Sequence, residues 1–214
     1  MLRWIVAIFL FSVPDFAFGA LLHSELEPSV SQSAAKTGAQ TLPPIGFVDF
    51  CKRYQQECTK WLPTPGRIHL GVQDLEQVNK VNQLINAKVA PISDEVLYNT
   101  PEHWDYPTGA GDCEDYVLLK RQYLLKLGVP IALMPITVVL DETGGGHAVL
   151  TLLTDRGDLV LDNRRDDIRD WRFTGYKFLK RQAQGNPRMW VALQTQPLDS
   201  QAISPQGPLV PSSQ

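Results

Sequence analysis

Three residues of this chain have the types of a nucleophile, a base and an orienting acid. Cys113 stands at the expected start of a helix, where backbone N–H groups and the helix dipole favour a thiolate and can hold an oxyanion. His147 begins one short apolar segment and Asp162 ends the next. If these segments are neighbouring antiparallel strands, the two side chains lie side by side, and the carboxylate orients the imidazole.

Each of the three residues also has an ordinary alternative. Cys113 could be a small buried apolar residue, His147 a turn residue and Asp162 a loop cap. A zinc site built from the same three side chains would lack a fourth ligand. Spacing alone therefore leaves a catalytic triad and three unrelated structural residues both open.

The elements that must position these residues follow from the apolar periodicity. Helical spacing precedes Pro63, Pro91 and Gly128, and three glycines between two strands indicate a hairpin. The expected helices cover residues 47–58, 75–89 and 113–127, and the expected strands cover 134–140, 147–154, 159–161 and 190–193. Helices followed by strands predict an α+β fold with an antiparallel sheet.

Composition limits the class of protein. The chain has 214 residues, 43% of them hydrophobic, which suits one packed domain. It carries 20 Lys and Arg against 23 Asp and Glu, a net charge of -3, without a basic cluster. We therefore expect no nucleic-acid partner.

The chain ends predict export and flanking tails. Residues 1–19 have the layout of a cleavable signal peptide: Arg3, an apolar run too short to span a bilayer, and small residues at the cleavage point. We expect a linker at 20–44, the domain at 45–194 and a disordered tail at 195–214. The mature protein is expected in the periplasm, an oxidising compartment.

Acidic residues crowd the candidate nucleophile. Asp112, Glu114 and Asp115 flank Cys113, and carboxylates near a thiol raise its pKa and weaken the nucleophile. One interpretation is helix capping and pairing with the helix dipole. The other is a bound hard cation that cancels the repulsion, for which calcium is suited.

The other two cysteines are Cys51 and Cys58. On one continuous helix they would be about 10 Å apart along the axis, too far for a disulfide. A break near residues 55–57 would bring them together. The pair is therefore either a disulfide or two buried thiols.

Several motifs together resemble a known family. Residues 111–116 (GDCEDY), 146–150 (GHAVL) and 161–163 (LDN), with Glu102 and Trp104 upstream, are similar to the bacterial transglutaminase-like cysteine proteinases. The resemblance covers residues 47–193 and implies a papain-like or transglutaminase-like fold. It assigns the roles of nucleophile, general base and orienter to Cys113, His147 and Asp162.

The resemblance also implies finer properties. It implies calcium dependence through Asp112 and Glu114, with Asp115 as a weaker ligand, and oxyanion stabilisation by the Cys113 N–H. Trp104 is a further candidate for the site wall.

The expected function is that of a periplasmic endopeptidase. The resemblance implies that its substrate is a large surface adhesin, cleaved near its N-terminus to control attachment and biofilm, and that its partner is an inner-membrane receptor for a cyclic dinucleotide. Alternatives are a transglutaminase- or amidase-like acyl transferase acting on envelope protein or peptidoglycan, and a non-catalytic binding module.

Overall fold

The computed structural model describes residues 34–59 and 66–194. A seven-stranded sheet dominates this part of the chain, and every neighbouring pair of its strands is antiparallel. The strands are β1 (Thr37–Thr41), β4 (Ile136–Leu140), β5 (Gly146–Thr154), β6 (Gly157–Asp162), β7 (Arg165–Asp170), β8 (Lys177–Ala183) and β9 (Asn186–Leu193). Their order across the sheet is β1-β9-β8-β4-β5-β6-β7. The predicted α+β class is confirmed.

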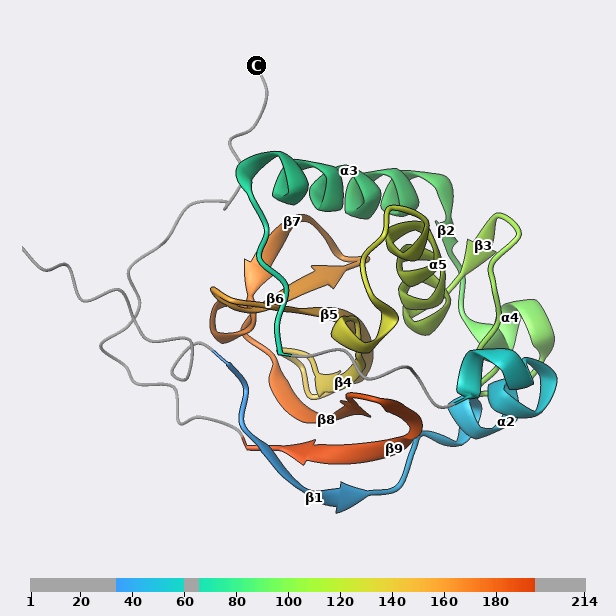
Figure 1. The fold of residues 1–214 in the computed structure, drawn as a ribbon. Coiled ribbons are helices and arrows are strands. Elements are labelled where there is room, and N and C mark those ends of the chain that lie inside the picture. Colours follow the sequence, from blue (N-terminus) through green and yellow to red (C-terminus); the bar gives the residue numbers. More distant parts are fainter. Residues whose placement is uncertain (1–33, 60–65, 195–214) are drawn as a thin grey trace, which may run out of the picture.

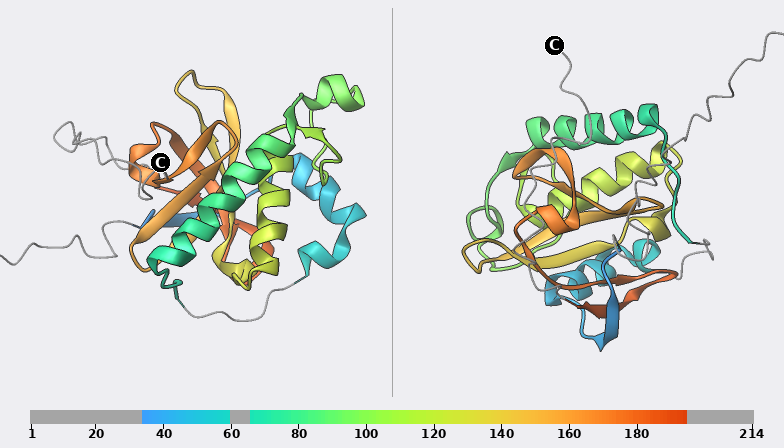
Figure 2. Two further views of the ribbon diagram at one scale, coloured as in Figure 1. Left: turned by 90° about the horizontal axis from the view of Figure 1, so that it is seen from above. Right: turned by 90° about the vertical axis from the view of Figure 1, so that its left-hand side faces the viewer.

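Helices precede most of the sheet in the chain. They are α2 (Ile45–Arg53), α3 (Val72–Lys88), α4 (Asp94–Tyr98) and α5 (Cys113–Lys126), with short 3-10 turns at Gln55–Cys58, Ile131–Leu133 and Trp171–Phe173. A small parallel pair, β2 (Ala90–Pro91) and β3 (Ala110–Gly111), brackets α4. The helices α3 and α5 contact each other and pack against β5, β6 and β7 on one face of the sheet (Figures 1 and 2).

Apolar side chains cover both faces of the central strands. The larger cluster lies between the helices and the sheet and includes Phe47, Leu118 and Trp190. A smaller one on the opposite face includes Val149 and Trp171. Burial on both faces explains why β5 reads as a nearly continuous apolar run instead of alternating. Each fully buried Leu, Ile or Phe contributes about 1.5–3 kcal/mol, so these layers hold the site rigidly in place.

The expected linker at residues 20–44 needs a correction. Residues 37–41 form β1, which pairs with β9, so the folded domain begins before residue 45. Signs of a strand are weak there because β1 is a largely exposed edge strand with small polar residues. The expected signal peptide at 1–19 and tail at 195–214 lie outside the described residues.

Two further strands were not expected from the sequence. The edge strand β7 (RDDIRD) is charged, with Ile168 as its buried residue. The strand β8 buries Arg181 and Gln182, whose polar groups are paired inside the protein. Neither segment has the apolar content from which a strand is predicted.

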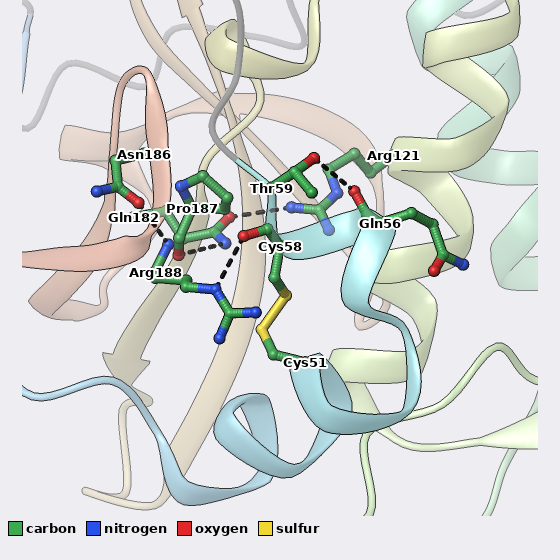
Figure 3. Close-up of a disulfide and its surroundings, with 9 residues drawn as sticks. All are labelled: Cys51, Gln56, Cys58, Thr59, Arg121, Gln182, Asn186, Pro187 and Arg188. Carbon is green, nitrogen blue, oxygen red and sulfur yellow. Dashed lines mark hydrogen bonds between the residues drawn. A yellow bond between two sulfur atoms is a disulfide. The ribbon is translucent and has the colours of Figure 1, made fainter.

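The expected helix at residues 47–58 is broken at Tyr54. Its backbone (φ −116°, ψ 65°) leaves the helical region, so α2 ends at Arg53 and a 3-10 turn follows. This break brings Cys51 and Cys58 within 5.6 Å (Cα to Cα) and joins them in a disulfide (Figure 3). The Arg188 Nε–H donates to the Cys58 carbonyl (3.0 Å) and ties this turn to β9.

Among the residues that the structure describes, no helix is long and apolar enough to cross a membrane.

Candidate active site

Cys113 is the first residue of α5. At this position the backbone N–H has no carbonyl partner one turn earlier within the helix, so it remains available to a ligand. The side chain is half-buried, and the chain approaches it through β3 and Asp112. Asp112 occupies the N-cap position, but its carboxylate does not cap the helix; it accepts from the Asp94 N–H (3.2 Å). Asp112 is thus the N-cap residue by position, but the capping interpretation of its carboxylate is not supported.

His147 and Asp162 come from the adjacent strands β5 and β6. The pairing of Leu150 with Leu161 brings the start of one strand to the end of the other. The His147 Nε2 atom lies 2.9 Å from Asp162 Oδ1, and both side chains are almost fully buried. His147 Nδ1 is buried without a hydrogen-bond partner in the described part of the chain.

The strand that carries His147 also contacts the nucleophile. The Ala148 N–H donates to the Cys113 sulfur at 3.4 Å. This contact places the sulfur beside the strand that carries His147, at the residue that follows it. A thiol, an imidazole and a carboxylate that binds the imidazole are the groups needed for nucleophilic attack on an acyl group.

Several donors hold the Asp162 carboxylate. The Arg164 N–H donates to Oδ1 (3.1 Å) and the Tyr176 hydroxyl donates to Oδ2 (2.6 Å). Burial raises the pKa of the Asp162 carboxyl, but the bonds from His147 and Tyr176 outweigh it and lower the pKa to about 2. On α3, the Asn86 side-chain amide donates to the Asp162 carbonyl (3.1 Å). The carboxylate is therefore ionised and fixed in position.

Two ion pairs fasten the loops that flank the pair. Arg164 Nη1 lies 2.8 Å from Asp141 Oδ2, and Arg165 Nη2 lies 3.0 Å from Glu142 Oε1. The acids belong to the β4–β5 hairpin that leads into His147, and the arginines follow Asp162 directly. The two ion pairs join the loop that precedes β5 to the segment that follows β6.

The surroundings of the thiol are acidic. The Cys113 S–H donates to Glu114 Oε2 (3.2 Å). Burial and the neighbouring Glu114 raise the pKa of the Cys113 thiol well above its usual value. Burial also raises the pKa of Glu114 to about 10, and Asp112 adds to this effect. By themselves these residues favour the thiol over the thiolate.

A second acidic group lies beside the first. Ligand atoms of Asp94, Asp112 and Asp115 lie within 4.8 Å of one another, as do those of Asp112, Cys113 and Glu114. In the first group, one buried oxygen of each aspartate (Asp94 Oδ1, Asp112 Oδ1, Asp115 Oδ2) has no hydrogen-bond partner among the described residues. Burial raises the pKa of Asp115 to about 7, although the Asp105 N–H donates to its Oδ1. Oxygens of this kind can hold a hard cation.

Gly111 is required for the position of Asp115. A Cβ atom at residue 111 would lie 2.5 Å from Asp115 Oδ2. Only glycine allows the carboxylate to fold back against the chain just before Cys113. Close packing against Asp115 therefore explains why glycine occupies the first position of the GDCED motif.

Sequence reasoning missed two residues, Asp94 and Tyr176, and assigned a third, Trp104, to the site wall. Asp94 lies in α4 and Tyr176 follows a 3-10 turn, and neither stands near the motifs in sequence, so only the fold brings them to the site. Trp104 is 2% exposed, its ring packs edge-on against Phe47, and its indole N–H donates to Glu102 Oε2 (2.9 Å). Its one side-chain donor is already engaged and is not available to an oxyanion, and a place for Trp104 in the site wall stays a prediction.

The profile of the family described as bacterial transglutaminase-like cysteine proteinase BTLCP matches residues 37–197. The chain belongs to this family. It is therefore a cysteine peptidase, and the matched region begins at β1, in agreement with the corrected start of the domain. None of the curated proteins compared matches this proteinase.

Three solved structures of LapG from Legionella pneumophila are similar to this proteinase. The calcium-bound structure has 24% identity and a TM-score of 0.48 over 56% of this chain and 74% of that chain. A further LapG structure has 26% identity and a TM-score of 0.44 over 51% and 67% of the two chains. The EGTA-treated structure has 24% identity and a TM-score of 0.46 over 56% and 72%.

Proposed function

We propose that this proteinase is a periplasmic endopeptidase that cleaves a protein through an acyl-enzyme on Cys113. The observation that carries the proposal is the state of the imidazole. His147 Nε2 is bonded to Asp162 at 2.9 Å, while the buried Nδ1 has no partner in the described part of the chain. Cys113 contacts the next residue of the same strand, and we infer that Nδ1 takes the proton of the thiol.

The steps follow from this arrangement. The Cys113 sulfur forms a bond to a peptide carbonyl carbon as its proton passes to His147 Nδ1, and the Cys113 N–H donates to the resulting oxyanion. The C–N bond then breaks, and His147 gives the proton to the leaving amine. A water molecule, deprotonated by the same imidazole, attacks the thioester. The sulfur leaves, takes the proton back, and the carboxylic acid product is released.

Calcium is the cofactor that the acidic residues suit. The three unpartnered oxygens of Asp94, Asp112 and Asp115, with Glu114 beside Asp112, form a set of hard oxygen donors. When bound, the ion would supply positive charge that offsets the carboxylates around Cys113. Asp94 extends the set of Asp112, Glu114 and Asp115 that the sequence suggested.

The substrate and partners complete the proposal. The resemblance stated from the sequence favours a large surface adhesin, cleaved near its N-terminus, and an inner-membrane receptor for a cyclic dinucleotide. The signal-peptide layout of residues 1–19 supports export to the periplasm. Adhesin release would then control attachment and biofilm.

One experiment tests the catalytic proposal. The mature protein and its Cys113→Ala variant are incubated with a peptide library prepared from envelope proteins, and new N-termini are identified by mass spectrometry. We expect cleavage by the wild type alone. If a labelled amine is incorporated and no new N-termini appear, the protein is an acyl transferase. If neither product forms and iodoacetamide alkylates Cys113 at an ordinary thiol rate, the protein is a binding module.

A second experiment tests calcium. EGTA is expected to abolish cleavage and lower the melting temperature, because an ion at about a hundred times its Kd stabilises the fold by about 2.7 kcal/mol. The Asp94→Asn variant should lose the thermal shift on calcium addition, whereas Asp49→Asn, which alters an exposed acid on α2, should keep it. Cleavage and melting temperature that are unchanged in EGTA would remove calcium from the proposal.

Comparison of surface proteins in cells that carry wild type or Cys113→Ala tests the substrate. Release of a large adhesin by the wild type alone is expected. An unchanged surface proteome would exclude that substrate class.

A further inference from the structure

Tyr176 contacts both members of the His147–Asp162 pair. Its hydroxyl donates to Asp162 Oδ2 at 2.6 Å. Its ring packs edge-to-face on the imidazole, with centroids 5.6 Å apart and an interplanar angle of 79°. One side chain therefore contacts both the imidazole ring and the carboxylate oxygen that does not bind the imidazole.

The fold brings Tyr176 to this position from a distant part of the chain. Across the sheet, His147 pairs with Val139 of β4, and Val139 pairs with Phe178 of β8. Tyr176 lies just before β8, after Gly175, whose φ of +82° turns the chain there. The Tyr176 N–H donates to the Thr174 hydroxyl oxygen (3.2 Å), which stabilises the turn. The backbone around the tyrosine is thus held by contacts that do not involve Asp162.

We propose that Tyr176 is a positioning residue of the reaction, which holds the Asp162 carboxylate and the His147 ring in the orientation that proton transfer from Cys113 requires. The proposal rests on the proposed catalytic function and adds a fourth residue to it. Without the hydroxyl, Oδ2 of Asp162 loses its donor and the carboxylate can rotate. Without the tyrosine ring, the imidazole of His147 loses a packing contact that restricts its rotation.

Two variants separate these contacts. Tyr176→Phe removes the hydroxyl and keeps the ring, and Tyr176→Leu removes both. Hydrolysis of p-nitrophenyl acetate supplies kcat and KM without knowledge of the natural substrate. We expect Tyr176→Phe to lower kcat by about tenfold with KM unchanged, because a hydrogen bond to a charged group is lost. Tyr176→Leu should lower kcat further.

The matched control is Tyr54→Phe. The Tyr54 hydroxyl donates to Asp105 Oδ1 at 2.5 Å, so this variant loses the same kind of bond away from the imidazole. We expect a loss of melting temperature similar to that of Tyr176→Phe but a wild-type kcat. If kcat falls equally in both variants, or does not fall in Tyr176→Phe, the proposal is overturned.

The imidazole provides an independent readout. In protein labelled with ¹⁵N-histidine, assigned through His147→Gln, the wild type should show His147 in the Nε2–H form that the bond to Asp162 requires. Tyr176→Phe should reduce this form, and Tyr54→Phe should not. A wild-type signature in Tyr176→Phe would overturn the proposal. If Cys113→Ala hydrolyses the ester as fast as wild type, the catalytic proposal fails, and the ¹⁵N signature alone then decides the role of Tyr176.

Discussion

Lys120 allows a test of buried charge next to the site. It lies two turns after Cys113 on α5, its side chain is fully buried, and its Nζ has no hydrogen-bond partner among the described residues. The ring of Tyr116 lies 5.8 Å from Nζ. Because an ammonium in such surroundings has lost its hydration, we predict that Lys120→Met stabilises the protein at neutral and acidic pH.

The magnitude follows from the pKa. Burial lowers the pKa of Lys120 from 10.5 to about 7, although the charges of Asp162 and Asp166 act in the opposite direction. At about 1.4 kcal/mol for each pKa unit, this difference corresponds to an upper value of about 5 kcal/mol. Relaxation around the ammonium reduces this cost, and we expect Lys120→Met to raise the free energy of unfolding by about 2–5 kcal/mol.

The size of this stabilisation depends on pH. Below pH 7 the amine is charged in both states, so the folded protein carries the whole cost of burial. Between pH 7 and 10.5 the unfolded chain binds a proton that the folded chain does not, and the stability of the wild type rises with pH. The advantage of Lys120→Met should therefore be largest below pH 7 and should disappear as the pH approaches 10.5.

Urea unfolding at about pH 6 and about pH 9, in the presence of calcium, measures this difference. The matched control is Lys126→Met, which removes an exposed lysine from the same helix and should change stability little at either pH. If Lys120→Met destabilises the protein at the lower pH, or if its effect does not shrink with rising pH, the reasoning from an unpaired buried ammonium is refuted.

Three other variants test the triad, the disulfide and the helix packing. Asp162→Asn should lower kcat for ester hydrolysis by about 10³–10⁴-fold with an unchanged circular dichroism spectrum, because the imidazole loses its orienting carboxylate; near-normal kcat would argue against the triad. The double variant Cys51→Ala and Cys58→Ala should lose about 2.5 kcal/mol in urea unfolding, since the closed loop is short, and an unchanged midpoint would contradict a structural role. Gly46→Ala would place a Cβ 2.4 Å from Trp104 Cδ1 and should cost about 1–3 kcal/mol, seen as a lower melting temperature; an unaffected melting temperature would show that the ring can shift.

The motifs carried most of what could be predicted about the chemistry. A cysteine at a helix start, followed by a histidine and an aspartate on two apolar segments, depends only on local pattern and on short strand pairing. The helices α3 and α5 and the strands β4, β5 and β6 were foreseen for the same reason. The apolar residues of these elements are spaced as burial on one face or both faces requires, and this spacing is visible in the sequence.

Contacts between segments that are distant in the chain cannot be predicted from the sequence pattern. Edge strands β1 and β7 are polar because one side faces solvent, so their place in the sheet shows only when the partner strand is beside them. Asp94 and Tyr176 reach the site through the β2–β3 pairing and the β4–β8 register. The candidate catalytic residues are thus readable from local sequence, whereas the residues that hold them depend on long-range packing of the whole sheet.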